Sequence, residues 1–94
     1  MKAVVINEKD NVAVALTDLA AGEVVMVRAG GGFKEVRAGE NILRGHKIAL
    51  TNIEKGESVI KYGEVIGLAS HSIMEGSHVH IHNVVGQRGK GIKK

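Results

Sequence analysis

The chain has 94 residues and a formal net charge of +3, and apolar residues occupy 44% of its positions. This length supports one domain with a core of modest size. There is no cysteine, which excludes disulfide bonds and thiolate metal sites. No apolar run approaches the ~18 residues of a membrane span, and the apolar start of the chain is too short for a signal peptide. We therefore expect a cytoplasmic protein without a membrane segment.

The core must be aliphatic, because Phe33 and Tyr62 are the only aromatic residues. A small aliphatic core gives marginal stability, so we expect a permanent partner or a homo-oligomer.

The basic residues are concentrated at the end of the chain. Residues 86–94 contain four of the 13 lysines and arginines and no acid, and the remainder has nine basic and ten acidic residues, a formal charge of −1. We predict a domain over residues 1–85 and a basic flexible tail over residues 86–94 that is disordered or docks on a partner. Nucleic-acid binding is not expected, because aromatic side chains for base stacking are nearly absent.

Short apolar segments separated by turn residues predict a mostly-β domain. No segment sustains the 3.6-residue period of a helix for more than about two turns. Tyr62-Gly63 between two apolar segments predicts a tight hairpin, and the three glycines after Ala29 predict a flexible loop. The expected strands are residues 2–6, 12–16, 23–28, 33–37, 47–50, 59–61 and 64–68.

A glycine turn recurs along the chain, with an aliphatic residue three positions before the glycine and another three positions after it. Each glycine is expected to supply a positive φ, and the aliphatic residues are expected to anchor the turn on the core. The irregular spacing suits a folded-over domain with internal pseudo-symmetry better than an open solenoid. The four copies centre on Gly22, Gly39, Gly56 and Gly76.

Three histidines alternate with aliphatic residues near the end of the predicted domain. His78, His80 and His82 are separated by Val79 and Ile81, which predicts a strand with three imidazoles on one face. Neighbours on one strand face are roughly 6.6 Å apart, so two of them can converge on one divalent ion more easily than three. We expect His78, His80 and His82 to be candidate metal ligands on an exposed concave face near His46 and Lys61, with two of them binding the ion, or one binding it while the other two hold substrate. The alternative is a histidine ladder without a function.

Five further residues are candidates for substrate binding. His46 and Lys47 open a strand directly after a glycine, and Lys61 with Tyr62 could bind a carboxylate by charge and hydroxyl. Asn83 could orient an imidazole or hold a substrate hydroxyl. The alternatives are a loop histidine with a solvated lysine, a tyrosine that covers the core, and a turn asparagine. His71 lies away from the histidine segment and is a weaker candidate.

Three separated segments together resemble a known family. Gly45–Leu50, Val59–Gly67 and Gly76–Asn83 resemble the N-terminal domain of the altronate and galactarate dehydratase family, and the glycine turns resemble its SAF-type domain, which has the β-clip fold. The resemblance covers roughly residues 10–84. In that family the domain either precedes a large catalytic domain or is a separate small subunit, as in sulfolactate sulfo-lyase. Since the sequence stops at Lys94, the resemblance implies the small subunit.

The resemblance implies a metal-dependent lyase that acts on a sugar acid, such as altronate or galactarate, by β-elimination. Its metal would be Fe²⁺ or Mn²⁺, bound with the help of a large catalytic subunit that carries the main machinery. No catalytic residue is assigned to this chain, and the isolated chain is expected to be inactive. The competing hypothesis is a non-enzymatic carbohydrate- or protein-binding β module, with the histidines as a pH-sensitive contact.

Overall fold

The computed structural model describes residues 2–29, 32–80 and 82–86, and this part of the chain is all-β, as predicted. It contains no helix, and hence none that is long and apolar enough to cross a membrane. The basic tail beyond Gly86 and the centre of the loop after Ala29 lie outside the described residues. The described strands are β1 (Ala3–Val4), β2 (Val12–Ala15), β3 (Val24–Ala29), β4 (Gly32–Arg37), β5 (Lys47–Ala49), β6 (Ser58–Lys61), β7 (Glu64–Ala69), β8 (His78–Val79) and β9 (Val84–Val85).

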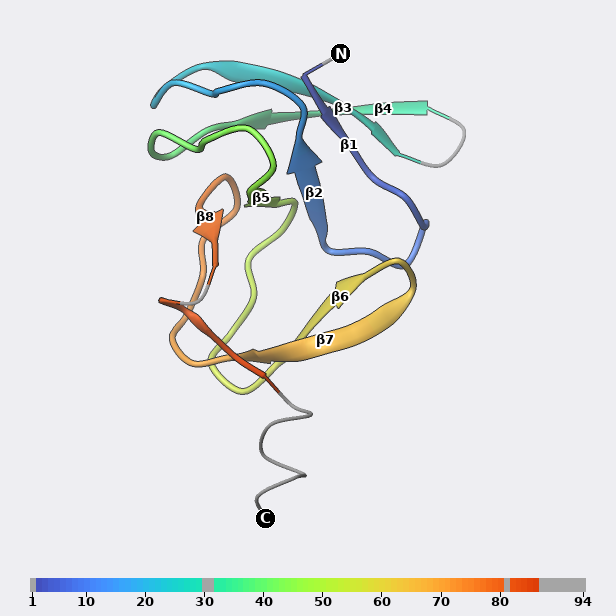
Figure 1. Ribbon diagram of the computed structural model, residues 1–94, viewed down its shortest axis with the longest axis vertical. Helices are drawn as coiled ribbons and strands as arrows, with labels where there is room; N and C mark the ends of the chain where they lie inside the picture. Colours follow the sequence, from blue (N-terminus) through green and yellow to red (C-terminus); the bar gives the residue numbers. More distant parts are fainter. Residues whose placement is uncertain (1, 30–31, 81, 87–94) are drawn as a thin grey trace.

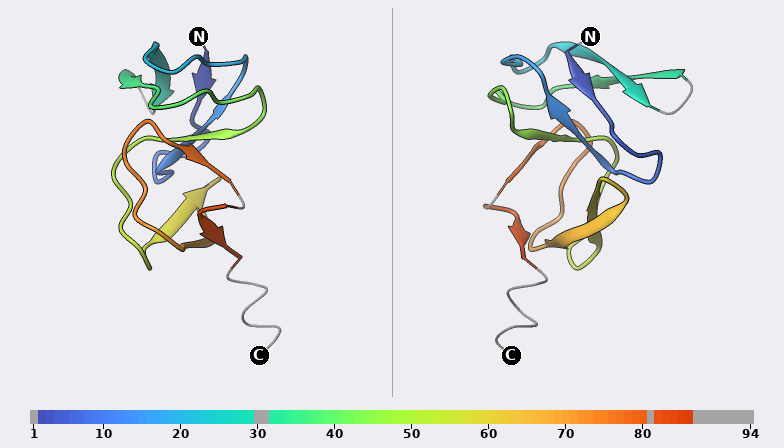
Figure 2. Two further views of the ribbon diagram at one scale, coloured as in Figure 1. Left: turned by 90° about the vertical axis from the view of Figure 1, so that its left-hand side faces the viewer. Right: turned by 45° about the vertical axis from the view of Figure 1, so that its right-hand side comes forward.

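The strands form two sheets. The larger has six strands in the order β4-β3-β1-β2-β5-β8, and the smaller has three in the order β6-β7-β9. Strands β1 and β3 run parallel, and the other neighbours are antiparallel. Figures 1 and 2 show β1, β3 and β4 at one end of the molecule, β6, β7 and β9 at the other, and β5 and β8 between them.

Two clusters of aliphatic side chains make the core. One lies within the larger sheet and includes Val25, Val27, Ile42 and Ile48. The other joins the two sheets and includes Val12, Ile53, Val59 and Ile73, with Val84 of β9 packed against it. β9 was not among the expected strands, and it supplies the last wall of this second cluster.

The glycine turn occurs four times, but one copy is at Gly45 and not at Gly39, where the sequence pattern predicted it. The φ angles of Gly22, Gly45, Gly56 and Gly76 are +87°, +87°, +90° and +91°. Gly39 has no positive φ, so assigning a copy to it was wrong. Its backbone N–H instead donates to the carbonyl of Gly76, at 2.9 Å, which places Gly39 beside a turn rather than within one.

Each of the four turns is closed in the same way. The residue after the glycine donates its N–H to the carbonyl three positions earlier, which together with the positive φ defines a type II turn. Each glycine N–H donates to the carbonyl of a buried alanine at 2.7–2.8 Å, and that alanine donates back to the residue after the glycine at 2.8–2.9 Å. The four alanines are Ala38, Ala15, Ala69 and Ala49, in the chain order of their glycines.

The turns associate in two pairs, which gives the domain the internal pseudo-symmetry expected from the sequence. Leu19 bridges to Ile42 in the first pair, and Ile53 bridges to Ile73 in the second. Side chains reinforce the pairing, because Asn41 accepts the backbone N–H of Ala21 in the opposite turn, at 2.9 Å. Asp18 and Asn52 accept the N–H groups of Arg44 and Glu75 in the same manner.

The predicted hairpin between β6 and β7 is confirmed. Tyr62 and Gly63 have φ angles of +59° and +76°, the signs of a type I′ turn, which matches the twist of paired strands. Asp10 accepts the N–H of Gly63 at 2.8 Å and so ties the turn to the loop before β2. Tyr62 is 55% exposed, so the alternative in which it covers the core is wrong.

The long histidine strand is not formed. β8 contains only His78 and Val79, and the chain then turns, with the N–H of Asn83 donating to the carbonyl of His80 at 3.1 Å. Ile81 lies outside the described residues. The side chain of Asn83 accepts the N–H of His80 and donates to the carbonyl of His78, both at 2.9 Å. These side-chain bonds compete with a sheet ladder and end the strand.

The corrected repeat predicts that alanine lowers the free energy of unfolding more at Gly45 than at Gly39. Gly45→Ala should lower the free energy of unfolding by about 1–3 kcal/mol, because a side chain is strained at positive φ. Gly39→Ala should change it by less than about 0.5 kcal/mol, since an added Cβ would lie at an ordinary 3.7 Å from the Gly76 carbonyl oxygen. Urea unfolding of the two variants measures both. A larger loss at Gly39 would favour the repeat register read from the sequence.

Candidate functional site

Three imidazoles converge where β5 meets β8. His46 directly precedes β5, which pairs antiparallel with β8 so that Ile48 lies opposite His78. The Nδ1 atom of His46 lies 2.8 Å from the Nε2 atom of His78, and the ring of His80 stacks on His46 at 4.4 Å between centroids. One ring nitrogen from each of the three lies within 4.8 Å of the others. We call His46, His78 and His80 the histidine trio.

The trio differs from the three histidines expected to bind metal. His46 was expected to contact substrate, yet its ring nitrogen is closest to that of His78. The ring of His82 lies 5.1 Å from that of His78 and is exposed, and its nitrogens are not among those that converge. The turn after β8 explains the difference, because His82 does not continue the strand face of His78.

The surroundings of His78 and His80 lower the pKa values of their imidazoles and so favour the neutral form. Burial lowers the pKa of His78, repulsion from the three neighbouring imidazoles lowers it further, and the Glu40 carboxylate partly opposes these effects. Burial also lowers the pKa of His80, followed by repulsion from His46, Lys47 and His82. A neutral imidazole presents the nitrogen lone pair that a metal needs, so these shifts suit ligands.

Two side chains hold the trio in place through the backbone. The Glu40 carboxylate accepts the N–H of His78 at 3.0 Å on the free edge of β8. Asn83 is only 9% exposed, and both ends of its amide are bonded to the backbone of His78 and His80. Asn83 therefore fixes the backbone turn after β8, as in the alternative of a turn asparagine, and its expected contact with an imidazole or a substrate hydroxyl stays a prediction.

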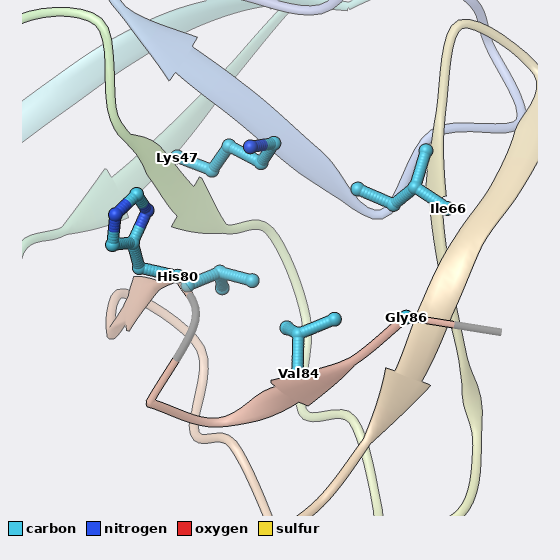
Figure 3. A pocket seen from close by; sticks show the side chains of 6 residues that line it. Lys47, Ile66, His80, Val84 and Gly86 are labelled. Atoms are coloured by element: carbon cyan, nitrogen blue, oxygen red, sulfur yellow. The ribbon is translucent and has the colours of Figure 1, made fainter. Parts of the chain in front are cut away.

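A cavity of about 230 Å³ opens beside the trio. Figure 3 shows Lys47 of β5 extending along it, with His80 at one side, Ile66 of β7 at the other and Val84 of β9 between them. Val79 and Gly86 complete the lining. The cavity is thus an apolar space with a histidine and a lysine on its border.

A lysine, Lys47, lines this cavity. Burial lowers the pKa of Lys47, and the positive charge of Lys61 lowers it further. The ammonium group of Lys61 lies 4.7 Å from the ring centroid of Tyr62, in a cation–π arrangement. Tyr62 itself is at the exposed hairpin tip and does not line the cavity.

Other residues lie away from the trio or were not foreseen. His71 is exposed, and its Nδ1 atom lies 3.0 Å from the Ser70 hydroxyl. Ile66 and Val84 line the cavity but were not singled out, because an apolar residue in a short strand looks the same in sequence whether it faces a core or a ligand. His46 was expected to contact substrate, and the signal that could have marked it as a metal-ligand candidate is its position in the repeat, where two other copies have glutamate.

Metal binding should distinguish the trio from its neighbour. His46→Ala, His78→Ala and His80→Ala should each weaken binding of Fe²⁺ or Mn²⁺ at least about tenfold, since even outer-shell partners of ligands cost this much. His82→Ala should retain most of the affinity, because its nitrogens do not converge with the others. Anaerobic titration calorimetry on the folded variants measures this. Equal losses at all four positions would contradict the assignment.

Stability should fall on acidification. Because the folded pKa values of His78 and His80 are lowered, the unfolded chain binds more protons below the ordinary imidazole pKa of about 6.5. The free energy of unfolding therefore rises with pH through this window and is lowest below the folded pKa values. Thermal unfolding between pH 7 and pH 5 measures the slope. The His78→Gln/His80→Gln variant should show a shallower slope, and an unchanged slope would show that these two imidazoles do not cause it.

Comparison with known proteins agrees with this fold. The family model described as "Altronate/galactarate dehydratase SAF domain" matches residues 1–87. The chain is 49% identical over 83 residues to an altronate dehydratase of Escherichia coli (strain K12), covering 88% of this chain and 16% of that protein. It is 46% identical over 78 residues to an altronate dehydratase of Bacillus subtilis (strain 168), covering 83% of this chain and 15% of that protein.

A shorter relative is also similar. The alpha subunit of (2R)-sulfolactate sulfo-lyase from Chromohalobacter salexigens is 48% identical over 44 residues, which cover 47% of this chain and 47% of that protein. The chain thus spans a small part of the altronate dehydratases and about half of this subunit. The match over residues 1–87 shows that the chain belongs to the altronate/galactarate dehydratase SAF domain family.

Proposed function

We propose that this chain is the small subunit of a metal-dependent lyase that acts on a sugar acid, such as altronate or galactarate, by β-elimination. The main catalytic machinery would lie on a separate large subunit. The observation that carries the proposal is the convergence of the three trio nitrogens, within 4.8 Å of one another, on the border of a cavity that also contains a lysine.

The residues of the trio fit a divalent ion. Their donor set is three imidazole nitrogens, and the lowered pKa values of His78 and His80 keep two of them neutral. Imidazole suits iron, and Fe²⁺ or Mn²⁺ with further ligands from the large subunit is the proposed cofactor. A bound ion of this kind would polarise the carboxylate and the leaving hydroxyl of the substrate.

The chain's own side chains would bind and orient the acid. Lys47 would bind an anionic oxygen, and the apolar walls formed by Ile66 and Val84 would exclude water and strengthen that attraction. Asn83 would keep His80 at the border of the cavity. We assign the base that takes the α proton to the large subunit, because the trio's nitrogens are committed to the metal.

Two observations support a partner. The altronate dehydratases that resemble this chain are much longer, so this domain accounts for a small fraction of each. The sulfolactate sulfo-lyase relatives are named as alpha subunits, which places a similar chain in a multi-subunit lyase. In the altronate dehydratases, most of the protein thus lies outside a domain of this kind.

Reconstitution tests the proposal. The chain should co-purify with a large subunit from its own cells, and the complex should eliminate water from an aldonic or aldaric acid, or sulfite from a sulfonated one, whereas the chain alone should not. His80→Ala should lower kcat of the complex by at least about a hundredfold, because ligand loss costs more than the 10–100-fold of an outer-shell change. His71→Ala is the matched control, since it removes an exposed imidazole outside the trio.

Two results would each count against a part of the proposal. Turnover by the purified chain alone would show that the machinery is not on a partner. A co-purified complex that binds acids but turns over none of the panel would favour the binding module instead.

A further inference from the structure

Two hairpins of the domain are held in the same way. The β3–β4 hairpin lies between the Gly22 turn and Ala38, and the β6–β7 hairpin lies between the Gly56 turn and Ala69. In each, the glycine N–H donates to the alanine, and the alanine N–H donates to the residue after the glycine. The two hairpins are therefore equivalent units, and the neighbours of one can be compared with those of the other.

The two units differ in what lies beside their second strand. Next to β7, the N–H of Ser70 donates to the carbonyl of Asn83 at 2.9 Å, and the chain continues into β9, which pairs antiparallel with β7. Next to β4, the N–H of Gly39 donates to the carbonyl of Gly76 at 2.9 Å, but the chain then leaves to form β8, which pairs with β5. Within the described residues no strand lies beside β4 as β9 lies beside β7.

The outer edge of β4 presents unpaired backbone groups. Ala38 directs both its N–H and its carbonyl to the β3 side, and this direction alternates along an antiparallel strand. The backbone groups of Phe33 and Glu35 therefore point away from β3, whereas those of Lys34 and Val36 point toward it. In the described part of the chain none of these four residues has a backbone hydrogen bond outside the β3–β4 ladder. Such an edge is a template for pairing with another strand.

The side chains at this edge indicate what kind of strand would fit. Phe33 is 59% exposed and shares a sheet face with Met26 of β3, which is 42% exposed. Glu35 lies on the same face and is in no ion pair among the described residues. An added strand with an apolar residue beside Phe33 and a basic residue opposite Glu35 would complement both.

A second copy of this chain fits the edge poorly. Two β4 strands related by a two-fold axis and paired along residues 33–36 would be centred on Lys34 or Glu35. That residue would face its own copy, and like charges directly opposite each other are destabilising. A strand of different sequence is therefore favoured.

The edge also leads to the histidine trio. Gly39, just after β4, is bonded to Gly76, and the neighbouring Glu40 accepts the N–H of His78 at 3.0 Å. A strand seated on β4 would thus end beside the segment that carries the trio. A chain that completes the metal site has to approach this same segment.

We propose that the outer edge of β4 takes an extended strand of the large subunit, paired antiparallel as β9 pairs with β7. The identity of the partner rests on the proposed function. The free edge and the direction of pairing rest only on the comparison of the two hairpin units.

Amide hydrogen exchange in the co-purified complex tests the pairing. The complex is labelled in D₂O, exchange is quenched, and the amides of the released chain are read by NMR. The amides of Phe33 and Glu35 should exchange at least about tenfold more slowly in the complex than in the isolated chain, because a bonded amide must first open. The amides of Lys34 and Val36 are bonded to β3 in both states and serve as internal controls.

A proline variant tests the same bond by affinity. Glu35→Pro removes the outward N–H and leaves the bonds to β3 in place, which an edge strand tolerates. It should weaken assembly at least about tenfold relative to Glu35→Ala, which loses the same carboxylate but keeps the N–H. Thermal unfolding shows whether both variants are folded, and the exchange measurement on the unchanged chain decides if the proline variant is not. Equal assembly by the two folded variants would overturn the proposal.

The outcomes separate the docking edge from the proposed function. Turnover by a complex in which Phe33 and Glu35 exchange as fast as in the isolated chain would support the lyase and overturn the docking edge. Slow exchange in a complex that turns over no acid would support the docking edge and contradict the lyase. Slow exchange in the isolated chain would overturn the docking edge, with a second copy as the occupant if the rate depends on concentration and the chain's own residues if it does not. A chain that co-purifies with no large subunit would overturn both.

Discussion

The domain depends on one backbone interaction that occurs four times. In each copy a glycine at positive φ donates its N–H to a buried alanine, and the alanine donates back to the residue after the glycine. Alanine is small enough for the two backbones to approach, and glycine is the residue that adopts this turn without strain. A chain with few aromatic residues thereby builds a core from many short strands, since each turn places an aliphatic residue on either side of itself in the core.

The same interaction positions the candidate site. Two of the turns lead into β5 and β8, which pair with each other, so the residues that follow Gly45 and Gly76 are brought together. In the other two turns a glutamate follows the glycine, and its carboxylate accepts an N–H of its own turn. His46 occupies the equivalent position without such a bond to its own turn, and its ring is bonded to His78 instead. The scaffold is thus the same in all four turns, while the side-chain chemistry differs where β5 meets β8.

The site gathers groups that do not help the domain to fold. The imidazoles of the trio repel one another when protonated, and Lys47 and Lys61 repel each other across the two sheets. A divalent ion at the imidazoles, as in the proposed function, would relieve the first of these effects. Local conflicts of this kind inside an otherwise regular repeat are typical of functional positions.

Local patterns in the sequence determined most of the fold. Alternating and continuous apolar segments predicted seven strands within one or a few residues of their observed ends, and Tyr62-Gly63 predicted the hairpin. The consensus of the glycine turn was also correct, because it depends on a glycine and two aliphatic residues a few positions apart. The three histidines after Gly76 were also visible in the sequence, because they lie within a few positions of one another.

Tertiary structure decided the features that join distant residues. Gly39 and Gly45 satisfy the same local pattern, but Gly45 has a positive φ and donates its N–H to Ala15, whereas Gly39 donates its N–H to Gly76. The close approach of the Nδ1 atom of His46 to the Nε2 atom of His78 follows from the register of β5 against β8, across 32 positions of sequence. The side-chain bonds of Asn83 ended β8 early, although the alternation of residues favoured a longer strand. Local propensity determines which segments are strands, whereas long-range pairing determines which side chains meet, since partners far apart in the chain leave no periodic trace.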